Sequence, residues 1–125
     1  MFRSRMLLVC LIALPVSLWG CGTSARNLKL NTDLARTSLE KAMKAWVDGK
    51  KPSDLKPEIT IGDASWEAGT TLVSYEFKKE GEHSDGTNLC VPVVRKLRDA
   101  GGKVSTSETI YIVGTSPVIT IFPQE

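Results

Sequence analysis

Three residue types that hydrolases use for nucleophilic catalysis stand side by side at His83, Ser84 and Asp85. A base, a hydroxyl and a carboxylate act together only when they converge on one reacting atom, so a triad is recognised by its geometry. Adjacent residues in a polar loop, here residues 80–88, do not converge in this way, and a solvated loop is the expected structure. We predict no catalytic residue in this loop.

The same loop carries groups that can bind metals, in Glu80, Glu82, His83 and Asp85. Their spacing matches neither a calcium-binding loop nor a closed zinc site. We expect a solvated acidic loop, and we predict no metal and no cofactor for the chain.

The three cysteines are Cys10, Cys21 and Cys90. Cys90 lies in an apolar stretch, where an unpaired cysteine usually behaves as a small buried hydrophobe. A nucleophilic thiol needs a base nearby, and the single histidine of the chain is in the polar loop. We therefore predict neither a catalytic thiol nor a disulfide.

Aromatic side chains are the candidate contacts for a ligand or partner, namely Trp66, Tyr75 and Phe77. Trp66 precedes a strand pattern, where a tryptophan either plugs the end of the core or lines the mouth of a pocket. The plug is favoured, because a small domain needs large apolar anchors. Tyr75 and Phe77 alternate with polar residues, which places them with Val73 on the predicted core face of a strand.

The chain opens with a basic start and a short apolar run. Arg3 and Arg5 precede the run, which ends at Leu18, and the small residue Gly20 follows. This arrangement is typical of a secretory signal peptide, which is removed from the mature protein.

The end of this run, Leu18-Trp19-Gly20-Cys21, resembles the lipobox of bacterial lipoproteins. Leu18, Gly20 and Cys21 match that pattern, whereas Trp19 departs from it, since small or β-branched residues are usual there. The resemblance implies that the Cys21 thiol takes a diacylglyceryl group and that cleavage makes Cys21 the new N-terminus. It also implies a place in the cell envelope, anchored to membrane lipid, with Gly22 favouring the outer membrane if the cell is Gram-negative.

Two alternatives remain for this segment. Cleavage after Ala25, where residues 23–25 form a small-x-small site, would give a secreted or periplasmic soluble protein. A retained membrane helix is the weaker alternative, because the run is shorter than the roughly 20 apolar residues of a span and contains Pro15.

Composition limits the mature chain to one domain and argues against nucleic acid as a partner. Of 125 residues, 16 are Lys or Arg and 14 are Asp or Glu. Two arginines leave with residues 1–20, so the remaining 105 residues carry 14 basic and 14 acidic side chains. We divide the chain into a signal peptide, 1–20, a lipidated cysteine with its tether, 21–31, and a domain, 32–125.

One amphipathic helix is predicted for residues 33–48, with Thr32 as its N-cap and Trp46 on its apolar stripe. Alternating patterns then predict five strands, at residues 58–61, 70–78, 89–97, 104–113 and 118–122. Residues 64–69 are expected to form a turn. Pro92 cannot donate to a ladder, so the third strand should lie at an edge or carry a bulge.

These elements predict an α+β fold, in which one N-terminal amphipathic helix packs on a curved antiparallel sheet of four to five strands. The order of elements is similar to the cystatin-like and NTF2-like architectures, which host unrelated functions. We expect a non-enzymatic envelope module with an unidentified envelope protein as its partner. A small-ligand carrier with an apolar pocket is the alternative, and an enzyme ranks third.

Overall fold

The main helix is the first element of the part that the computed structural model describes, residues 29–124. Helix α2 spans Thr32–Val47 and buries one stripe of side chains. Its N-cap is Asn31 and not the expected Thr32, because the Asn31 carboxamide oxygen accepts the Leu34 N–H at 3.0 Å. The helix ends at Val47, with Asp48 as its C-cap, and Gly49 follows with a φ of +87°, the left-handed conformation that glycine tolerates best.

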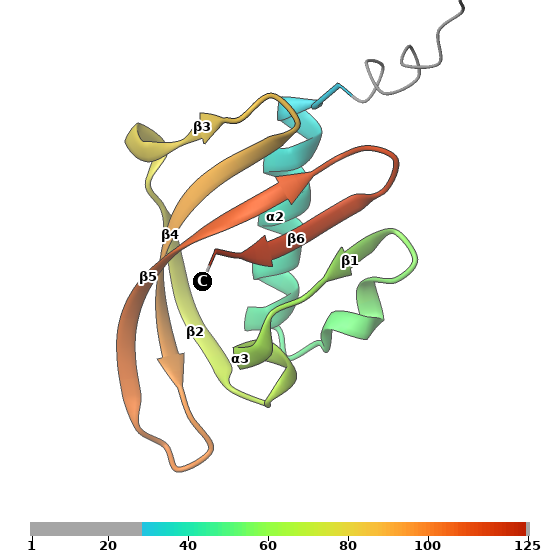
Figure 1. Cartoon of the computed structure of the whole chain (residues 1–125). Coiled ribbons are helices and arrows are strands. Elements are labelled where there is room, and N and C mark those ends of the chain that lie inside the picture. The colour runs from blue at the N-terminus through green and yellow to red at the C-terminus, as the bar shows by residue number, and fades with distance from the viewer. Residues whose placement is uncertain (1–28, 125) are drawn as a thin grey trace, which may run out of the picture.

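The strands form one curled sheet in front of α2 (Figure 1). The sheet order is β1-β6-β5-β4-β2, with β3 pairing with β4 beyond the end of β2. The strand bounds are β1 Ile59–Ile61, β2 Thr71–Phe77, β3 His83–Ser84, β4 Asn88–Arg98, β5 Val104–Gly114 and β6 Ile119–Pro123.

The predicted α+β class is confirmed, but the prediction of an antiparallel sheet of four to five strands is wrong in detail. The sheet is mixed and has six strands, because β1 pairs in parallel with β6 while the other pairs are antiparallel. The parallel pair sets Ile59 beside Ile119 and Ile61 beside Ile121. A short strand from the middle of the chain thereby buries its two isoleucines against the last strand.

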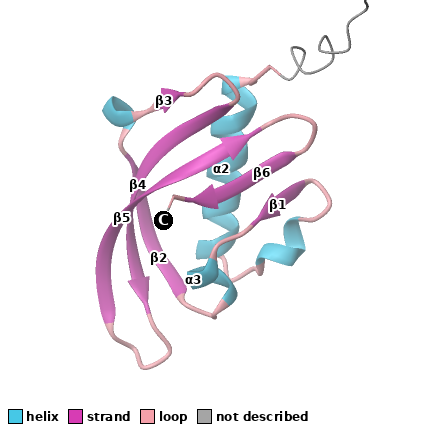
Figure 2. Ribbon diagram, viewed as in Figure 1, coloured by secondary structure: helices cyan, strands magenta, loops and turns pink. Residues whose placement is uncertain are grey.

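Three short helices connect the larger elements (Figure 2). The 3-10 helix η1, Pro52–Leu55, and the 3-10 helix η2, Lys79–Gly81, precede β1 and β3. Helix α3, Ala64–Glu67, replaces the turn expected at residues 64–69. Its N-cap is Asp63, whose carboxylate accepts the N–H groups of Ser65 and Trp66.

Pro92 lies in an interior strand, so the expectation of an edge strand is wrong. The alternative, a bulge in this strand, is wrong as well, because the register of β4 against β5 is unbroken and the shift against β2 lies within β2. β4 pairs with β5 on one side and with β2 and β3 on the other. The Pro92 carbonyl accepts the Lys78 N–H at 2.9 Å, so its backbone faces the β2 side. At that point η2 separates β2 from β3, so no neighbouring strand needs the N–H that proline lacks.

A β-bulge in β2 changes which residues face the core. The register of β2 against β4 shifts between Leu72 and Ser74. Leu72, Tyr75 and Phe77 therefore share the inner face, while the sequence pattern had grouped Val73 with the two aromatics and Leu72 on the other side. Leu72 is almost fully buried.

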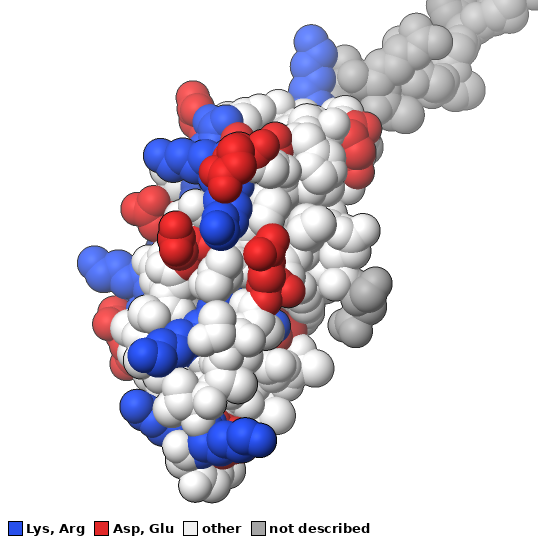
Figure 3. Space-filling view, turned by 90° about the vertical axis from the view of Figure 1, so that its left-hand side faces the viewer, with Lys and Arg blue, Asp and Glu red and all other residues white. Residues whose placement is uncertain are grey.

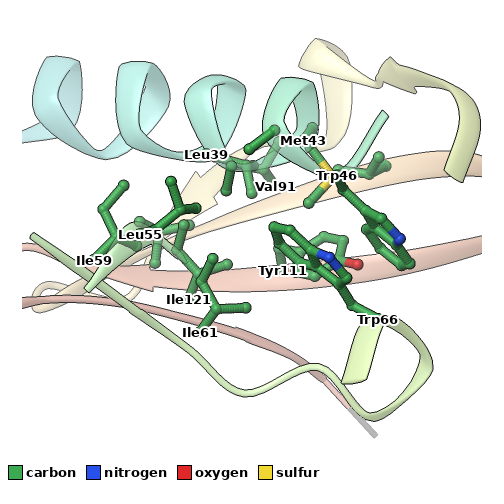
Figure 4. Packing of buried hydrophobic residues seen from close by; sticks show 14 of the residues in the cluster. Leu39, Met43, Trp46, Leu55, Ile59, Ile61, Trp66, Val91, Tyr111 and Ile121 are labelled. Atoms are coloured by element: carbon green, nitrogen blue, oxygen red, sulfur yellow. The ribbon is translucent and has the colours of Figure 1, made fainter. Parts of the chain in front are cut away.

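The core fills the space between α2 and the inner face of the sheet (Figure 4). Leu39, Met43 and Trp46 descend from the helix onto side chains of β1, β4, β5 and β6. Trp66 of α3 closes the end of this layer beside Trp46 and Tyr111. Burial of this continuous set is the main force that holds the helix on the sheet.

Candidate functional site

The outer face of the sheet, opposite α2, carries a partly exposed apolar patch. Because side chains alternate along a strand, residues next to buried Val93, Tyr111, Val113 and Ile121 point away from the core. We define the outer patch as four apolar side chains on this face that are not buried, Val94, Ile110, Ile112 and Phe122. Of the described helices, none covers the patch in Figure 1, where the sheet stands in front of α2.

Phe122 is the aromatic residue of this patch, and 42% of its surface is accessible. Its ring lies against the backbone of Gly62, where a Cβ would meet the ring at 2.6 Å. Phe122 also faces Ile112 across the β5–β6 pair. The patch therefore presents a ring that is already held in place, as contact surfaces for proteins often do.

Trp66, a sequence-predicted contact residue, is only 4% exposed. It stacks on Trp46 with ring centroids 5.0 Å apart and planes 5° apart. Its indole N–H donates to the Lys50 carbonyl at 2.7 Å, and that of Trp46 donates to the Thr70 carbonyl at 2.8 Å. Both indole N–H groups thus bind the backbone of neighbouring loops, at Lys50 and Thr70. The Trp66 ring fills the end of the core.

Tyr75 and Phe77, the other two sequence-predicted contacts, are partly buried on β2 and lie side by side. Their rings are 5.3 Å apart and tilted by 59°. Phe77 lines a groove of about 140 Å³ between α2 and the sheet, whose floor includes Leu39 and Val91. The structure therefore leaves Phe77 accessible from this groove, on the side of the sheet away from the outer patch.

An ion pair stands at the rim of this groove. The Arg36 guanidinium of α2 donates to the Glu82 carboxylate, with the Arg36 Nε 2.9 Å from one of its oxygens. This hydrogen bond, more than the surrounding charges, lowers the pKa of Glu82 below its usual value. The pair ties the middle of the chain to the first turns of the helix.

The His83, Ser84 and Asp85 side chains turn to their own loop and do not converge. The His83 Nδ1 lies 3.0 Å from the Gly81 carbonyl, and the Ser84 hydroxyl accepts the Gly86 N–H. Asp85 accepts the N–H groups of Thr87 and Asn88, and these bonds lower the pKa of its carboxyl group. This loop also forms β3, a strand that its polar sequence did not predict.

Cys90 is buried, as its apolar surroundings predicted. Burial, followed by the charge of Asp85, raises the pKa of its thiol, which favours the protonated form. Within residues 29–124, no group of three or more His, Cys, Asp or Glu side chains is placed to hold a metal ion. No helix in that part of the chain is both long and apolar enough to span a membrane.

A buried polar cluster on the inner face was missed by sequence reasoning. The Tyr111 hydroxyl donates to the Asp63 carboxylate, and the Arg95 guanidinium donates to the Tyr111 hydroxyl at 3.1 Å. Arg95 also donates to the Ser107 hydroxyl at 3.0 Å, and its Nη1 lies 3.9 Å from Asp63. We call Asp63, Arg95 and Tyr111 the Arg95 cluster.

Burial gives this cluster its electrostatic character. The side chains of Asp63 and Arg95 are 2% and 11% exposed. Burial, and then the neighbouring Asp63 charge, raise the pKa of Tyr111 well above its usual value, so the phenol stays protonated and donates. One sequence signal pointed here: Arg95 continues the inward alternation of Leu89, Val91 and Val93, which brings a charge onto a core face.

Lipidation of Cys21 lies outside the described residues. Comparisons of the chain with protein-family models, with curated proteins and with solved structures find no match. The function is therefore argued from the surfaces described above.

Proposed function

We propose that the chain is a non-enzymatic module of a bacterial cell envelope, anchored to membrane lipid through acylated Cys21, that binds another envelope protein. The outer patch carries this proposal. It joins an aromatic side chain, 42% exposed, to two partly exposed isoleucines on the neighbouring strand β5. Contiguous exposed apolar surface of this kind is typical of contact sites for proteins.

The chemistry of the reactive side chains supports a binding role over an enzymatic one. The candidate triad residues are engaged with their own loop, and the Cys90 thiol is held in its protonated form. Positive and negative side chains lie next to each other in the upper part of the face shown in Figure 3, and its right-hand part is largely uncharged. Apolar contact, more than attraction of one sign of charge, then provides the affinity for the partner.

The test is whether replacement of Phe122 abolishes capture of the partner protein. The intact lipidated protein is used to isolate its partner from membranes, and the same is done with Phe122→Ser. We expect the variant to lose the partner, because removal of a central aromatic anchor typically costs more than about 2 kcal/mol of binding.

Val47→Ser is the matched control, since Val47 is 39% exposed but lies on α2. It should retain the partner, and melting curves should show that both variants are folded at the temperature of the capture. Capture of the same protein by Phe122→Ser would contradict the role of the outer patch.

Small-ligand binding is a second candidate function, and the groove beside Phe77 favours it. Its volume of about 140 Å³ is close to that of an engineered apolar cavity of about 150 Å³ that binds benzene. Titration with benzene should shift the amide resonances of Phe77 and Val91 in a saturable way. Shifts that do not saturate would remove this candidate.

A further inference from the structure

A second pocket lies on the inner face, beside the Arg95 cluster and away from the outer patch. Its volume is about 190 Å³. The polar groups that line it come from three elements and their flanks, Asp63, Ser65, Arg95, Thr109 and Gln124. The pocket thus joins one cation, one anion, two hydroxyls and one amide.

The first observation is that Arg95 has more N–H groups than acceptors among the described residues. A guanidinium carries five N–H groups. Nη1 donates to the Tyr111 hydroxyl and Nη2 donates to the Ser107 hydroxyl. The Nε is buried and has no acceptor among the residues that the structure describes. A buried donor without a partner is costly. Nη1 and Nη2 carry two N–H groups each, and each has one acceptor within the described residues, so an oxygen bound in the pocket that Arg95 lines can accept from Arg95 as well.

The second observation is the charge balance of the pocket. Asp63 lies 3.9 Å from the Arg95 guanidinium and compensates its charge. The Asp63 carboxylate is itself engaged by Tyr111 and by the N–H groups of Ser65 and Trp66. An anionic ligand would add an uncompensated charge beside the buried Asp63–Arg95 pair, which is expensive. An uncharged oxygen can accept from Arg95 without that penalty.

The third observation is the mixture of groups around Arg95. Hydroxyls, such as those of Ser65 and Thr109, both donate and accept, and the Gln124 amide does the same through two atoms. A ligand with several hydroxyls complements these side chains, because each of its hydroxyls can also both donate and accept a hydrogen bond. A cavity of about 150 Å³ holds one six-membered carbon ring, so the present pocket accommodates a ring with a few polar substituents.

We propose that this pocket binds an uncharged, hydroxyl-rich ring of the size of one sugar unit. A hydroxyl or ring oxygen accepts from Arg95, and neighbouring hydroxyls bond to Ser65, Thr109 and Gln124. A free monosaccharide and the terminal unit of a longer glycan share this chemistry. This site is independent of the protein contact proposed for the outer patch.

The test is a titration followed by amide resonances of the full chain, extracted from membranes in a detergent that carries no sugar. Glucose, galactose, mannose and N-acetylglucosamine are added separately. At least one of them should shift the resonances of Ser65 and Thr109 in a saturable way. Glucuronate, which differs from glucose by a carboxylate, should bind more weakly than the neutral sugars. A trisaccharide of the sugar that binds distinguishes a free monosaccharide from the end of a glycan as the ligand. Tighter binding of the trisaccharide identifies the end of a glycan, and weaker binding identifies the free monosaccharide.

Two variants on opposite faces of β5 control the experiment. Thr109→Val removes a lining hydroxyl at nearly constant shape and should weaken binding about fivefold, the effect of one lost hydrogen bond. Thr106→Val, exposed on the other face of the strand, should leave binding unchanged. The proposal is overturned if none of the four sugars shifts these resonances, if glucuronate binds more tightly than every neutral sugar, or if Thr109→Val binds as the wild type does.

Discussion

At the scale of single residues, two tryptophans connect the core to the loops around it. Trp46 and Trp66 stack on each other, and each donates its ring N–H to a carbonyl of a neighbouring segment, at Thr70 and Lys50. The stack therefore contributes both apolar burial and two satisfied buried donors. Its loss affects α2, α3 and the start of β2 together.

We predict that Trp46→Ala lowers the free energy of unfolding by about 3–5 kcal/mol, the usual range for a large buried aromatic. That is a large part of the about 5–15 kcal/mol by which domains are stable. Denaturant melts of the fragment from Asn27 onward measure the change. Val47→Ala, at the exposed neighbouring position, is the control and should shift the midpoint little. An unchanged midpoint for Trp46→Ala would place the ring outside the energetic core.

The burial of single core residues could be predicted from the sequence, but the contacts within the Arg95 cluster could not. Trp46 was predicted as the core anchor of its helix from spacing alone, and the structure confirms its burial. Asp63, Arg95 and Tyr111 come from a loop and two strands that only the folded sheet brings together. A pattern along the chain shows which face a residue is on, and it does not show which distant side chain it meets.

At the scale of elements, the long patterns were predictive and the short ones were not. The helix and five strands lie close to their expected positions, because their apolar periods are regular over many residues. β3, α3 and the bulge in β2 depend on local hydrogen bonds or on a partner strand, which leave little trace in a single sequence. Pro92 shows the same limit, since its compatibility with an interior strand depends on a break in its neighbour.

The junction of β1 and β6 offers a test of the outer patch. We predict that Gly62→Ala destabilises the fold by about 1–3 kcal/mol, because the new Cβ would lie 2.6 Å from the Phe122 ring. The double variant with Phe122→Ala removes that clash. Its loss of stability should therefore be smaller than the sum of the two single losses, as measured by chemical denaturation. Strict additivity would show that the ring does not rest on Gly62.

The ion pair between α2 and the segment before β3 predicts a pH dependence. Because the pKa of Glu82 is lowered in the folded state, its stabilising effect is present above the ordinary carboxyl value of 4.5. It is lost as the pH falls through the folded pKa, where Glu82 becomes protonated. Glu82→Gln should thus cost up to about 1 kcal/mol at neutral pH and nothing in strong acid.

Denaturant melts of wild type and Glu82→Gln across the acidic range measure this difference. Lys41 and Glu58 form another ion pair, with both side chains more than half exposed, and Glu58→Gln is the control. A stability difference that stays constant on acidification would mean that Glu82 acts through its shape and not through its charge.

At the scale of the whole molecule, the described chain begins at one end and the long β4–β5 hairpin projects from the other (Figure 1). The start of the domain is fastened, because the Asn31 N–H donates to the Thr115 hydroxyl at 2.9 Å, next to the end of β5. An anchor that precedes residue 29 would hold the domain by this end. The outer patch and the hairpin would then remain accessible to a partner.

We predict that Cys21→Ala abolishes the partitioning of the mature protein into the detergent phase, because acyl chains are its proposed link to the bilayer. Metabolic labelling with an alkynyl fatty acid should mark the wild type and leave the variant unlabelled. Cys90→Ala is the matched control, since that thiol is buried in the fold, and it should label as the wild type does. Equal labelling of the wild type and Cys21→Ala would refute the lipid anchor. The outer patch would then have to recruit its partner from solution without the local concentration that a shared membrane provides.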